Sequence, residues 1–439
     1  MRLRFPHPLL LLLGAVLVAA LLTWVLPAGE YQRAPDPATG RDLVVAGTYH
    51  EVEARPVSLP AAVLAVPKGI VSGADVLLVI LMVGGVFSML EATGALARLV
   101  GGAVGRGGHP LVVITVVSAG FCLLGALENM YEEIVALVPV LVLLSRALGF
   151  GSLTALSMCL GSAVIGAAFS PINPFGAGLA LKLAELPALG GAGVRVAMTV
   201  AAFVLWVGWT WTQRSRDDVR PETAPPPLEP PTARDVVLLA LAMVPFVPYV
   251  YGVLALDWGF NELSALFLVA AFVLGFAARW SLRDSADRFL TGMAGMLTAG
   301  IFVGVARGIS VVLTDGGIID TIVYGLATPL AGAPPLAAAL GMVPVHALLH
   351  QAVPSNSGQA ALAMPIMAPL ADLLGLSRQA AVVAYQLGAP LLDMITPTNG
   401  ALFAMLGGAG VSFGRWLRFA VPGMLLVSAV GLVGLILLR

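Results

Sequence analysis

The chain has 439 residues, of which 59% are hydrophobic and 11% are charged, and its formal net charge is −1. Soluble globular domains carry about 25% charged residues, so a soluble fold could not bury this much apolar surface and the expected solvent is lipid. A nearly neutral chain gives no indication of a nucleic-acid partner. The sequence has no Gly-Lys-Ser/Thr phosphate-binding motif, which argues against ATP as the energy source.

The chain begins with an apolar stretch at residues 9–26, which is too long for the core of a signal peptide and predicts a retained membrane helix. Arg2 and Arg4 place the N-terminus in the cytoplasm by the positive-inside tendency. The next segments are predicted as a polar external loop at 27–57, an interfacial arm at 58–72 and a helix that returns to the cytoplasm at 74–99. Together, residues 1–99 are the expected scaffold of the first half.

Residues 109–148 are long enough for two helices, but their centre carries the polar run Glu128-Asn-Met-Tyr-Glu-Glu133. A loop with so many polar atoms cannot face lipid. Two interpretations remain, namely a pair of spans joined outside, or a re-entrant hairpin whose tip stops in mid-membrane against protein. The hairpin makes the remaining topology consistent. Residues 151–186 are then predicted as a span broken at Ser170-Pro-Ile-Asn-Pro174, and 189–213 as a returning helix.

Residues 214–234 contain four arginines and the run Pro225-Pro-Pro, which predict a cytoplasmic linker between the halves 1–213 and 235–439. An extra span at 235–254 would invert the second half relative to the first. The scaffold at 235–331 is expected to contain spans at 262–279 and 289–314 and an arm at 318–331. A hairpin is expected next, at 335–374. A broken span at 377–405 and a last span at 416–438 would complete the chain.

The predicted fold is therefore an all-α polytopic membrane protein with roughly nine spans. Its two inverted repeats would each carry a re-entrant hairpin and a broken transmembrane helix. The last span would leave the C-terminus outside the cell.

One offset of 226 residues relates the interruptions in the two halves: Asn129 corresponds to Ser355, and the run Ser170–Asn173 corresponds to Thr396–Asn399. Breaking a helix in hydrocarbon leaves backbone N–H and C=O groups without partners, at a cost of several kcal/mol each. Half-helix N-termini attract anions, and half-helix C-termini attract cations. Kinks without a function are the alternative, but four matched breaks favour a transporter whose site lies where the breaks meet.

Hydroxyl and amide groups at the breaks, together with one arginine, are predicted to bind a solute carboxylate: Asn129, Ser170, Asn173, Ser355, Asn356, Ser357, Thr396, Thr398, Asn399 and Arg307. Oxygen atoms of a partly overlapping set are candidate ligands for Na⁺: Glu128, Asn129, Asn173, Asn356, Asn399 and Asp393. Asp393 is also a candidate proton site. No catalytic residue is assigned, and no cofactor is expected beyond Na⁺ or H⁺ as the coupling ion.

Arg307 lies far from either end of its predicted span, so it either attracts an anionic solute or forms an ion pair with Asp315 or Asp393. Glu132 and Glu133 either contribute to the site or cap the second helix of the first hairpin.

His346 and His350 are spaced four residues apart, as in a zinc-protease helix, but Ala347 stands where that motif needs glutamate. Packing or hydrogen bonding is the expected role of both histidines, with proton transfer as an alternative.

Several motifs resemble the anaerobic C4-dicarboxylate carrier family, and most closely its YfcC-like branch. In the second half these are Arg307-Gly-Ile-Ser-Val-Val-Leu, Pro354-Ser-Asn-Ser-Gly-Gln-Ala-Ala, Met364-Pro-Ile-Met-Ala-Pro-Leu-Ala-Asp372 and Thr396-Pro-Thr. In the first half they are Thr23-Trp-Val-Leu-Pro-Ala-Gly-Glu-Tyr31, Gly47-Thr-Tyr, Pro67-Lys-Gly and Asn173-Pro-Phe. The chain departs from the family pattern at Gly388-Ala-Pro390, where relatives often carry Gly-Asp-Gly, and at Asp393, where they often carry Asn.

The resemblance implies a member of the ion-transporter superfamily in the bacterial inner membrane, often a homodimer, with an elevator-like movement of the hairpin domain. It implies transport of a C4-dicarboxylate or an amino acid, coupled to Na⁺, H⁺ or counter-substrate. Carried over by motif, the sites would be Glu128-Asn129, Ser170–Pro174, Ser355–Ser357 and Thr396–Gly400. The main hypothesis is therefore a secondary active transporter. The alternatives are an intramembrane hydrolase that uses His346 or His350, and a passive anion channel.

Overall fold

The computed structural model describes residues 7–36, 41–105, 109–173, 175–187, 189–214, 230–256 and 258–438. Arg2, Arg4, Pro174, most of the predicted linker and the side chain of Glu128 lie outside the described part. Within it, nine helices are long and apolar enough to cross a membrane: Pro8–Val25, Ala74–Ala92, Pro110–Leu127, Ser152–Phe169, Ala192–Gln213, Ala233–Val253, Phe260–Ala277, Leu282–Asp315 and Phe413–Leu437. The chain is thus a multi-pass membrane protein.

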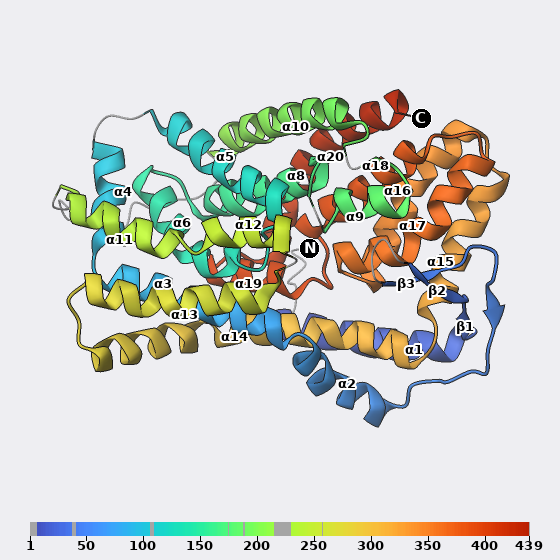
Figure 1. Cartoon of the computed structure of the whole chain (residues 1–439), viewed down its shortest axis with the longest axis horizontal. Coiled ribbons are helices and arrows are strands. Elements are labelled where there is room, and N and C mark those ends of the chain that lie inside the picture. Colours follow the sequence, from blue (N-terminus) through green and yellow to red (C-terminus); the bar gives the residue numbers. More distant parts are fainter. Residues whose placement is uncertain are drawn as a thin grey trace, which may run out of the picture.

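One layer of helices is built around the longest one, α14, which spans Leu282–Asp315. It packs along α3 and α2 most extensively, and also along α1 and α13, and these helices cross the lower part of Figure 1. Their bounds are Pro8–Val25 for α1, Leu59–Ser72 for α2, Ala74–Ala92 for α3 and Phe260–Ala277 for α13. Glycines allow the close approach, because a Cβ on Gly69 would meet the backbone of Gly304 and Gly308.

The second layer contains the interrupted helices and occupies the upper and right parts of Figure 1. Helix α5 packs on α8, α16 and α17 both pack on α18, and α10 packs on α20. The bounds are Pro110–Glu128 (α5), Ser162–Phe169 (α8), Ala192–Gln213 (α10), Pro335–Ala352 (α16), Asn356–Leu373 (α17), Arg378–Gly388 (α18) and Phe413–Leu437 (α20). Helix α6, Ile134–Ala147, contacts α3 and so connects the two layers.

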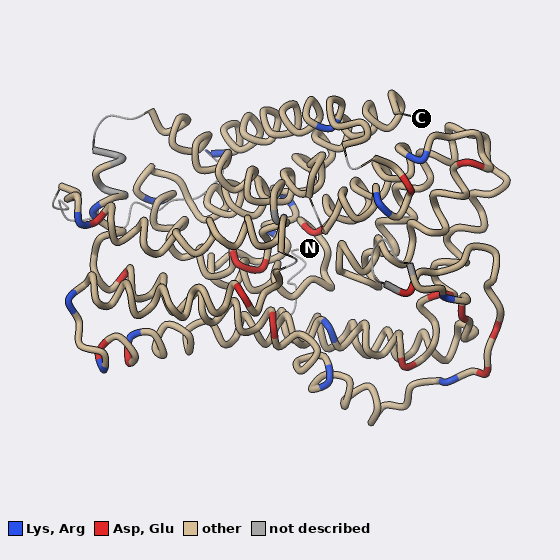
Figure 2. The backbone as a smooth tube through the Cα atoms, in the orientation of Figure 1, with Lys and Arg blue, Asp and Glu red and all other residues tan. Residues whose placement is uncertain are grey.

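Shorter elements complete the chain. They are α4 (Ala95–Gly105), α7 (Ser152–Leu156), the π-helix Ser157–Gly161 that leads into α8, α9 (Ala177–Leu183), α11 (Ala233–Met243), α12 (Phe246–Leu256), α15 (Ile319–Ala327), the 3₁₀ helices Thr328–Gly332 and Pro390–Met394, and α19 (Gly400–Gly408). Figure 2 shows charged residues toward the two ends of the horizontal helices and a second, mainly acidic group near the middle of the molecule. Charges at the ends suit the membrane surfaces, whereas charges in the middle need partners within the protein.

Three predicted segments differ from the structure. The helix expected at 74–99 ends at Ala92, because Gly94 adopts a left-handed conformation (φ 71°) before α4 begins. The span expected at 289–314 starts earlier, at Leu282, where the Ser281 side chain caps the first turn. The segment 377–405, predicted as a span broken at Thr396–Gly400, is interrupted from Ala389 onward, because the 3₁₀ helix Pro390–Met394 precedes the predicted break.

The loop predicted at 27–57 contains four short strands, which pair as β1 (Gly29–Glu30) with β4 (His50–Glu51) and as β2 (Arg33–Asp36) with β3 (Arg41–Val44), both antiparallel. Buried Asp320 of α15 anchors this ribbon, because it accepts hydrogen bonds from the Tyr31 backbone N–H and from Arg33 Nη2, each at 2.9 Å. Burial, together with the nearby Asp320 carboxylate, raises the pKa of the Tyr31 hydroxyl to about 12.

The contact between α5 and α8 gives a test of the packing. A Cβ on Gly166 would overlap the carbonyl oxygen of Cys122, and both residues are in helix interiors. Gly166→Ala is therefore expected to lower stability by about 1–3 kcal/mol through overpacking, measured as thermal unfolding in detergent. Gly120→Ala in α5 is the matched control, since nothing lies within 4 Å of its added Cβ. Equal unfolding temperatures for the two variants would contradict this packing.

Candidate functional site

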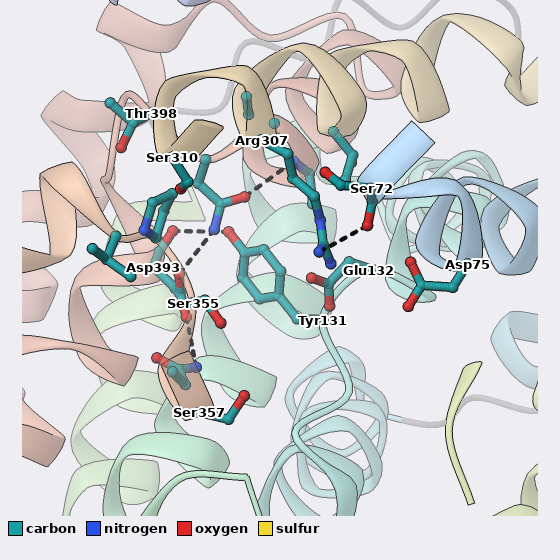
Figure 3. A pocket seen from close by; sticks show the side chains of 18 of the residues that line it. Ser72, Asp75, Tyr131, Glu132, Arg307, Ser310, Ser355, Ser357, Asp393 and Thr398 are labelled. Atoms are coloured by element: carbon teal, nitrogen blue, oxygen red, sulfur yellow. Dashed lines mark hydrogen bonds between the residues drawn. The ribbon is translucent and has the colours of Figure 1, made fainter. Parts of the chain in front are cut away.

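A cavity of about 750 Å³ lies between the two layers of helices. One wall comes from the scaffold helices and includes Asp75 of α3 and Arg307 of α14. The opposite wall comes from the interrupted segments, and Figure 3 shows polar side chains from both walls directed toward the same space. The polar lining residues are Ser72, Asp75, Asn129, Tyr131, Glu132, Arg307, Ser310, Thr314, Asp315, Ser355, Asn356, Ser357, Asp393, Thr398 and Asn399, together with Tyr249.

The first interruption lies between α5 and α6. Asn129 ends α5 in a left-handed conformation (φ 60°, ψ 34°), and its backbone N–H bonds to the Gly125 carbonyl. Asparagine tolerates this conformation better than most side chains, which suits it to end a helix. Glu133 is buried and its Oε2 accepts the backbone N–H of Tyr131 at 3.1 Å, so it stabilises the turn. The turn places Asn129 and Glu132 on the cavity wall.

The second interruption, between α8 and α9, is held by two buried side chains. Ser170 Oγ donates to the Ala126 carbonyl at 2.8 Å and accepts the N–H of Asn173 at 2.9 Å. Asn173 Oδ1 accepts the N–H groups of residues 175 and 176, and its Nδ2 donates to Gly125 O (2.8 Å) and to Asn129 Oδ1 (3.3 Å). Ser170 and Asn173 thus satisfy the broken backbone and support Asn129 from behind the cavity lining.

The break in the second half uses the same device. Asn399 Oδ1 accepts the N–H groups two and three residues ahead, those of Ala401 and Leu402, as Asn173 does in the first half. Thr396 is buried, and its Oγ1 donates to the Leu392 carbonyl at 2.8 Å. Ser355 caps α17 by accepting the Gly358 N–H at 3.3 Å. Asn173 and Asn399, which correspond in sequence, therefore accept the same pattern of backbone N–H groups, whereas Ser170 and Thr396 form different hydrogen bonds.

Asn356 joins the two halves at the cavity. Its Nδ2 donates to Asp393 Oδ2 at 3.0 Å and to Asn129 Oδ1 at 3.4 Å. The Oδ1 atom of Asn356 is buried and has no hydrogen-bond partner. The residue is 7% exposed and lines the cavity. A buried carbonyl oxygen without a donor is costly, so this atom points to a ligand that donates a hydrogen bond or carries a positive charge. Thr398 Oγ1 is a second buried polar atom without a partner on this wall.

Asp393 is the most highly connected residue of the site. Its Oδ1 accepts Asn399 Nδ2 at 2.8 Å and lies 3.0 Å from His350 Nε2. Gln359 Nε2 donates to the His346 carbonyl at 2.8 Å, which orients the Gln359 amide so that its Oε1 accepts from His350 Nδ1 at 2.8 Å. One proton must then lie between His350 Nε2 and Asp393, since two facing lone pairs would repel. The contact between His350 and Asp393 thus lies next to the cavity.

On the scaffold wall, Arg307 Nη1 donates to the Ser72 carbonyl at 3.3 Å, and the side chain is exposed to the cavity. The two ion pairs proposed for it from sequence do not form in the structure. Asp315 pairs instead with Lys68 at 3.1 Å, and Asp393 with His350. This leaves the guanidinium available to a solute, close to Glu132 in Figure 3.

Carboxylates outnumber basic groups in the cavity. Among the described residues, its lining contains Asp75, Glu132, Asp315 and Asp393, whereas Arg307 is the one lysine or arginine. Asp315 and Asp393 have partners, so Asp75 and Glu132 remain to interact with a solute. The Oδ1 atom of Asp75 is buried without a hydrogen-bond partner. Among the described residues, Arg307, Asp75 and Glu132 therefore line the cavity without an ion pair, and Glu132 lies near enough to Arg307 for an electrostatic interaction.

The predicted site residues divide into two groups in space. Asn129, Ser355, Asn356, Ser357, Thr398, Asn399, Arg307 and Asp393 line the cavity, whereas Ser170, Asn173 and Thr396 lie behind it. The side chain of Glu128 is outside the described part. Asp75, Tyr131, Gln359 and Gln386 were missed by the sequence analysis, although Asp75 stands out as a lone acid at the start of an apolar helix. No group of three His, Cys, Asp or Glu side chains suited to a metal ion occurs in the described residues.

Comparison with known proteins places these features in context. The sequence model of the DcuC family, described as C4-dicarboxylate anaerobic carrier, matches residues 5–439. An uncharacterized protein of Haemophilus influenzae is 28% identical over 99% of this chain and 96% of its own length. A protein of Escherichia coli described as putative basic amino acid antiporter YfcC is 28% identical over 98% of this chain and 96% of its own length.

Two solved structures show weaker similarity. The YdaH transporter of Alcanivorax borkumensis has a TM-score of 0.46 and 19% identity, covering 98% of both chains. MtrF of Neisseria gonorrhoeae, described as illuminating a class of antimetabolite efflux pumps, has a TM-score of 0.45 and 15% identity, covering 99% of this chain and 95% of its own.

Proposed function

The chain belongs to the C4-dicarboxylate anaerobic carrier family, a family of transporters and not of enzymes, and we propose that it is a secondary active transporter for a small amphoteric solute. The solute would carry a carboxylate and at least one cationic group, as amino acids with a basic side chain do. The observation that carries this proposal is the charge of the cavity, in which Arg307 faces two carboxylates without ion-pair partners.

The charge balance favours a basic amino acid over a dicarboxylate. A dianion entering the cavity could pair with Arg307, but it would also face Asp75 and Glu132, and like charges at close range disfavour binding. A solute with one carboxylate and two ammonium groups would pair its carboxylate with Arg307 and its ammonium groups with the acceptor oxygens of Asp75 and Glu132. The description of the Escherichia coli relative as a putative basic amino acid antiporter supports this choice, whereas the family description supports a C4-dicarboxylate as the second candidate.

The hairpin wall supplies the remaining contacts for the solute. The first N–H groups of α17, next to Ser355 and Ser357, suit a carboxylate because a helix N-terminus carries partial positive charge. The free Oδ1 of Asn356 suits an ammonium group. Contacts from both sequence halves meet at this wall, as expected of a binding site formed between repeats.

The proposed mechanism is elevator-like. The two halves would be inverted repeats, with re-entrant hairpins formed by α5–α6 and α16–α17. The hairpin layer would move against the scaffold layer around α14 and expose the cavity alternately to each side. Transport would be coupled to Na⁺, to H⁺ or to counter-substrate, in a homodimer in the bacterial inner membrane with the N-terminus in the cytoplasm and the C-terminus outside.

Asn399→Ala tests the site directly. The change removes the cap of α19 and the amide that donates to Asp393, so uptake of L-lysine into proteoliposomes is expected to fall by at least about tenfold. Asn261→Ala, at an exposed position of α13, is the matched control. Gel filtration in detergent checks that the variants are folded. Wild-type uptake by folded Asn399→Ala protein would contradict the site.

The same assay separates the other functional classes. A carrier shows saturable flux and counterflow with unlabelled solute, whereas a passive channel shows neither. The solute recovered from the liposomes should be chemically unchanged, which a hydrolase would not give.

A further inference from the structure

The most unusual buried charge of the described structure lies away from the cavity, in the first turn of α10. Arg195 is fully buried, and among the described residues no carboxylate forms an ion pair with it. Its Nε donates to Gln386 Oε1 at 2.9 Å and its Nη1 to the Gly190 carbonyl at 2.6 Å, while Nη2 has no partner. A buried arginine held only by neutral groups costs stability, which calls for a reason other than packing.

The partner of Arg195 leads to the first broken helix. Gln386 of α18 is fully buried, and its Nε2 donates to the backbone carbonyl of Ser170 at 3.1 Å. Ser170 is the C-terminal cap of α8, where the last carbonyls of a helix have no partner within it. Gln386 thus satisfies a carbonyl that the break would otherwise leave unpaired.

Arg195 determines which way the Gln386 amide points. A guanidinium has donors and no acceptor, so the group facing it must be the amide oxygen. The amide nitrogen is thereby directed to Ser170. Without Arg195, the amide could flip and present its oxygen to the Ser170 carbonyl, which would repel it.

From Ser170 the hydrogen bonds continue to the cavity. Ser170 Oγ binds the backbone of α5 at Ala126 and receives the N–H of Asn173. Asn173 Nδ2 donates to Asn129 Oδ1, and Asn129 lines the cavity. A continuous series of buried and partly buried hydrogen bonds therefore joins α10, α18, the break and the tip of α5.

We propose that Arg195 and Gln386 are positioning residues, which hold the Ser170–Asn173 break so that Asn129 presents its amide to the solute. The proposal rests on the cavity being the transport site. It differs from a packing role because the effect depends on the direction of one amide and not on the volume that fills the space.

Gln386→Glu separates the two roles. Glutamate keeps the shape and an acceptor for Arg195 and adds an ion pair, but an ionised carboxylate has no donor for the Ser170 carbonyl. With L-lysine as the probe, KM for uptake at pH 7.5 is expected to rise about tenfold while the unfolding temperature stays at or above that of the wild type. Gln386→Leu should raise KM similarly and lower the unfolding temperature. Thr210→Val is the control, because it removes the bond from α10 to Ser157 without touching the break.

Hydrogen–deuterium exchange gives a readout that needs no solute. Peptides covering residues 125–133 and 170–176 should exchange faster in Gln386→Glu than in the wild type or in Thr210→Val. A KM within twofold of wild type, or unchanged exchange in both peptides, would overturn the proposal. If wild-type protein moves neither L-lysine nor succinate while exchange responds as expected, the proposed function fails and the structural link between Gln386 and the break stands.

Discussion

Replacing Asp393 by asparagine is expected to abolish transport, with uptake reduced by about 100-fold or more. Asp393 receives amide donors from Asn356 and Asn399 and shares a proton with His350. An asparagine side chain carries no charge to hold that proton, and its NH₂ group would face at least one of those donors. Both halves of the site are therefore expected to lose their common acceptor.

The measurement is L-lysine counterflow in proteoliposomes that contain equal amounts of folded protein. Asp287→Asn, in an exposed i,i+4 pair with Arg283, makes the same chemical change at a surface carboxylate and should leave flux unaltered. Counterflow by Asp393→Asn at more than a third of the wild-type rate would show that the carboxylate has no part in transport.

Removing the two free carboxylates is expected to change which solute the cavity prefers. In Glu132→Gln and Asp75→Asn proteins, KM for L-lysine should rise about tenfold or more, because each substitution weakens a charge-assisted contact to the cationic group. KM for L-norleucine, which has the same carbon chain without the terminal ammonium group, should change by less than threefold. Competition by succinate should become stronger, since the negative charge that opposes a dianion is reduced.

The control for this experiment is Glu51→Gln, which neutralises an exposed carboxylate of the strand ribbon that does not line the cavity. If the wild-type protein transports succinate in preference to L-lysine, and neither carboxylate substitution alters that preference, then the solute is a dicarboxylate. The assignment of Asp75 and Glu132 to the cationic group would then be wrong, while the cavity could still be the site.

The positions of the interruptions could be predicted from the sequence because helix breakers and small polar residues are local signals. Asn129, Asn173, Ser355 and Asn399 lie in breaks or at helix ends in the structure. Which of these residues line the cavity and which support it from behind could not be predicted, since this depends on how the helices pack. Asn173 and Asn399 correspond in sequence, yet Asn399 lines the cavity and Asn173 supports it from behind.

The ion-pair partners of the charged residues also could not be predicted from the sequence. A structural role for Arg307 predicts an ion pair with Asp315 or Asp393. In the structure, Asp315 pairs with Lys68 and Asp393 with His350, and both partners lie on other helices. Gln386 lies in an ordinary helical stretch and becomes informative only when α18 is placed against the end of α8. Contacts of this kind depend on long-range packing, which periodicity and composition do not encode.

The most direct test of the central claim is an experimental density map of the protein with L-lysine bound, compared with a map of the solute-free protein. We expect added density between Asn356 and Glu132 on the wall of interrupted segments and Arg307 on the scaffold wall, with α5 ending at Asn129 and α17 beginning at Asn356. Continuous helices through residues 129 and 356, or solute density outside this cavity, would contradict it.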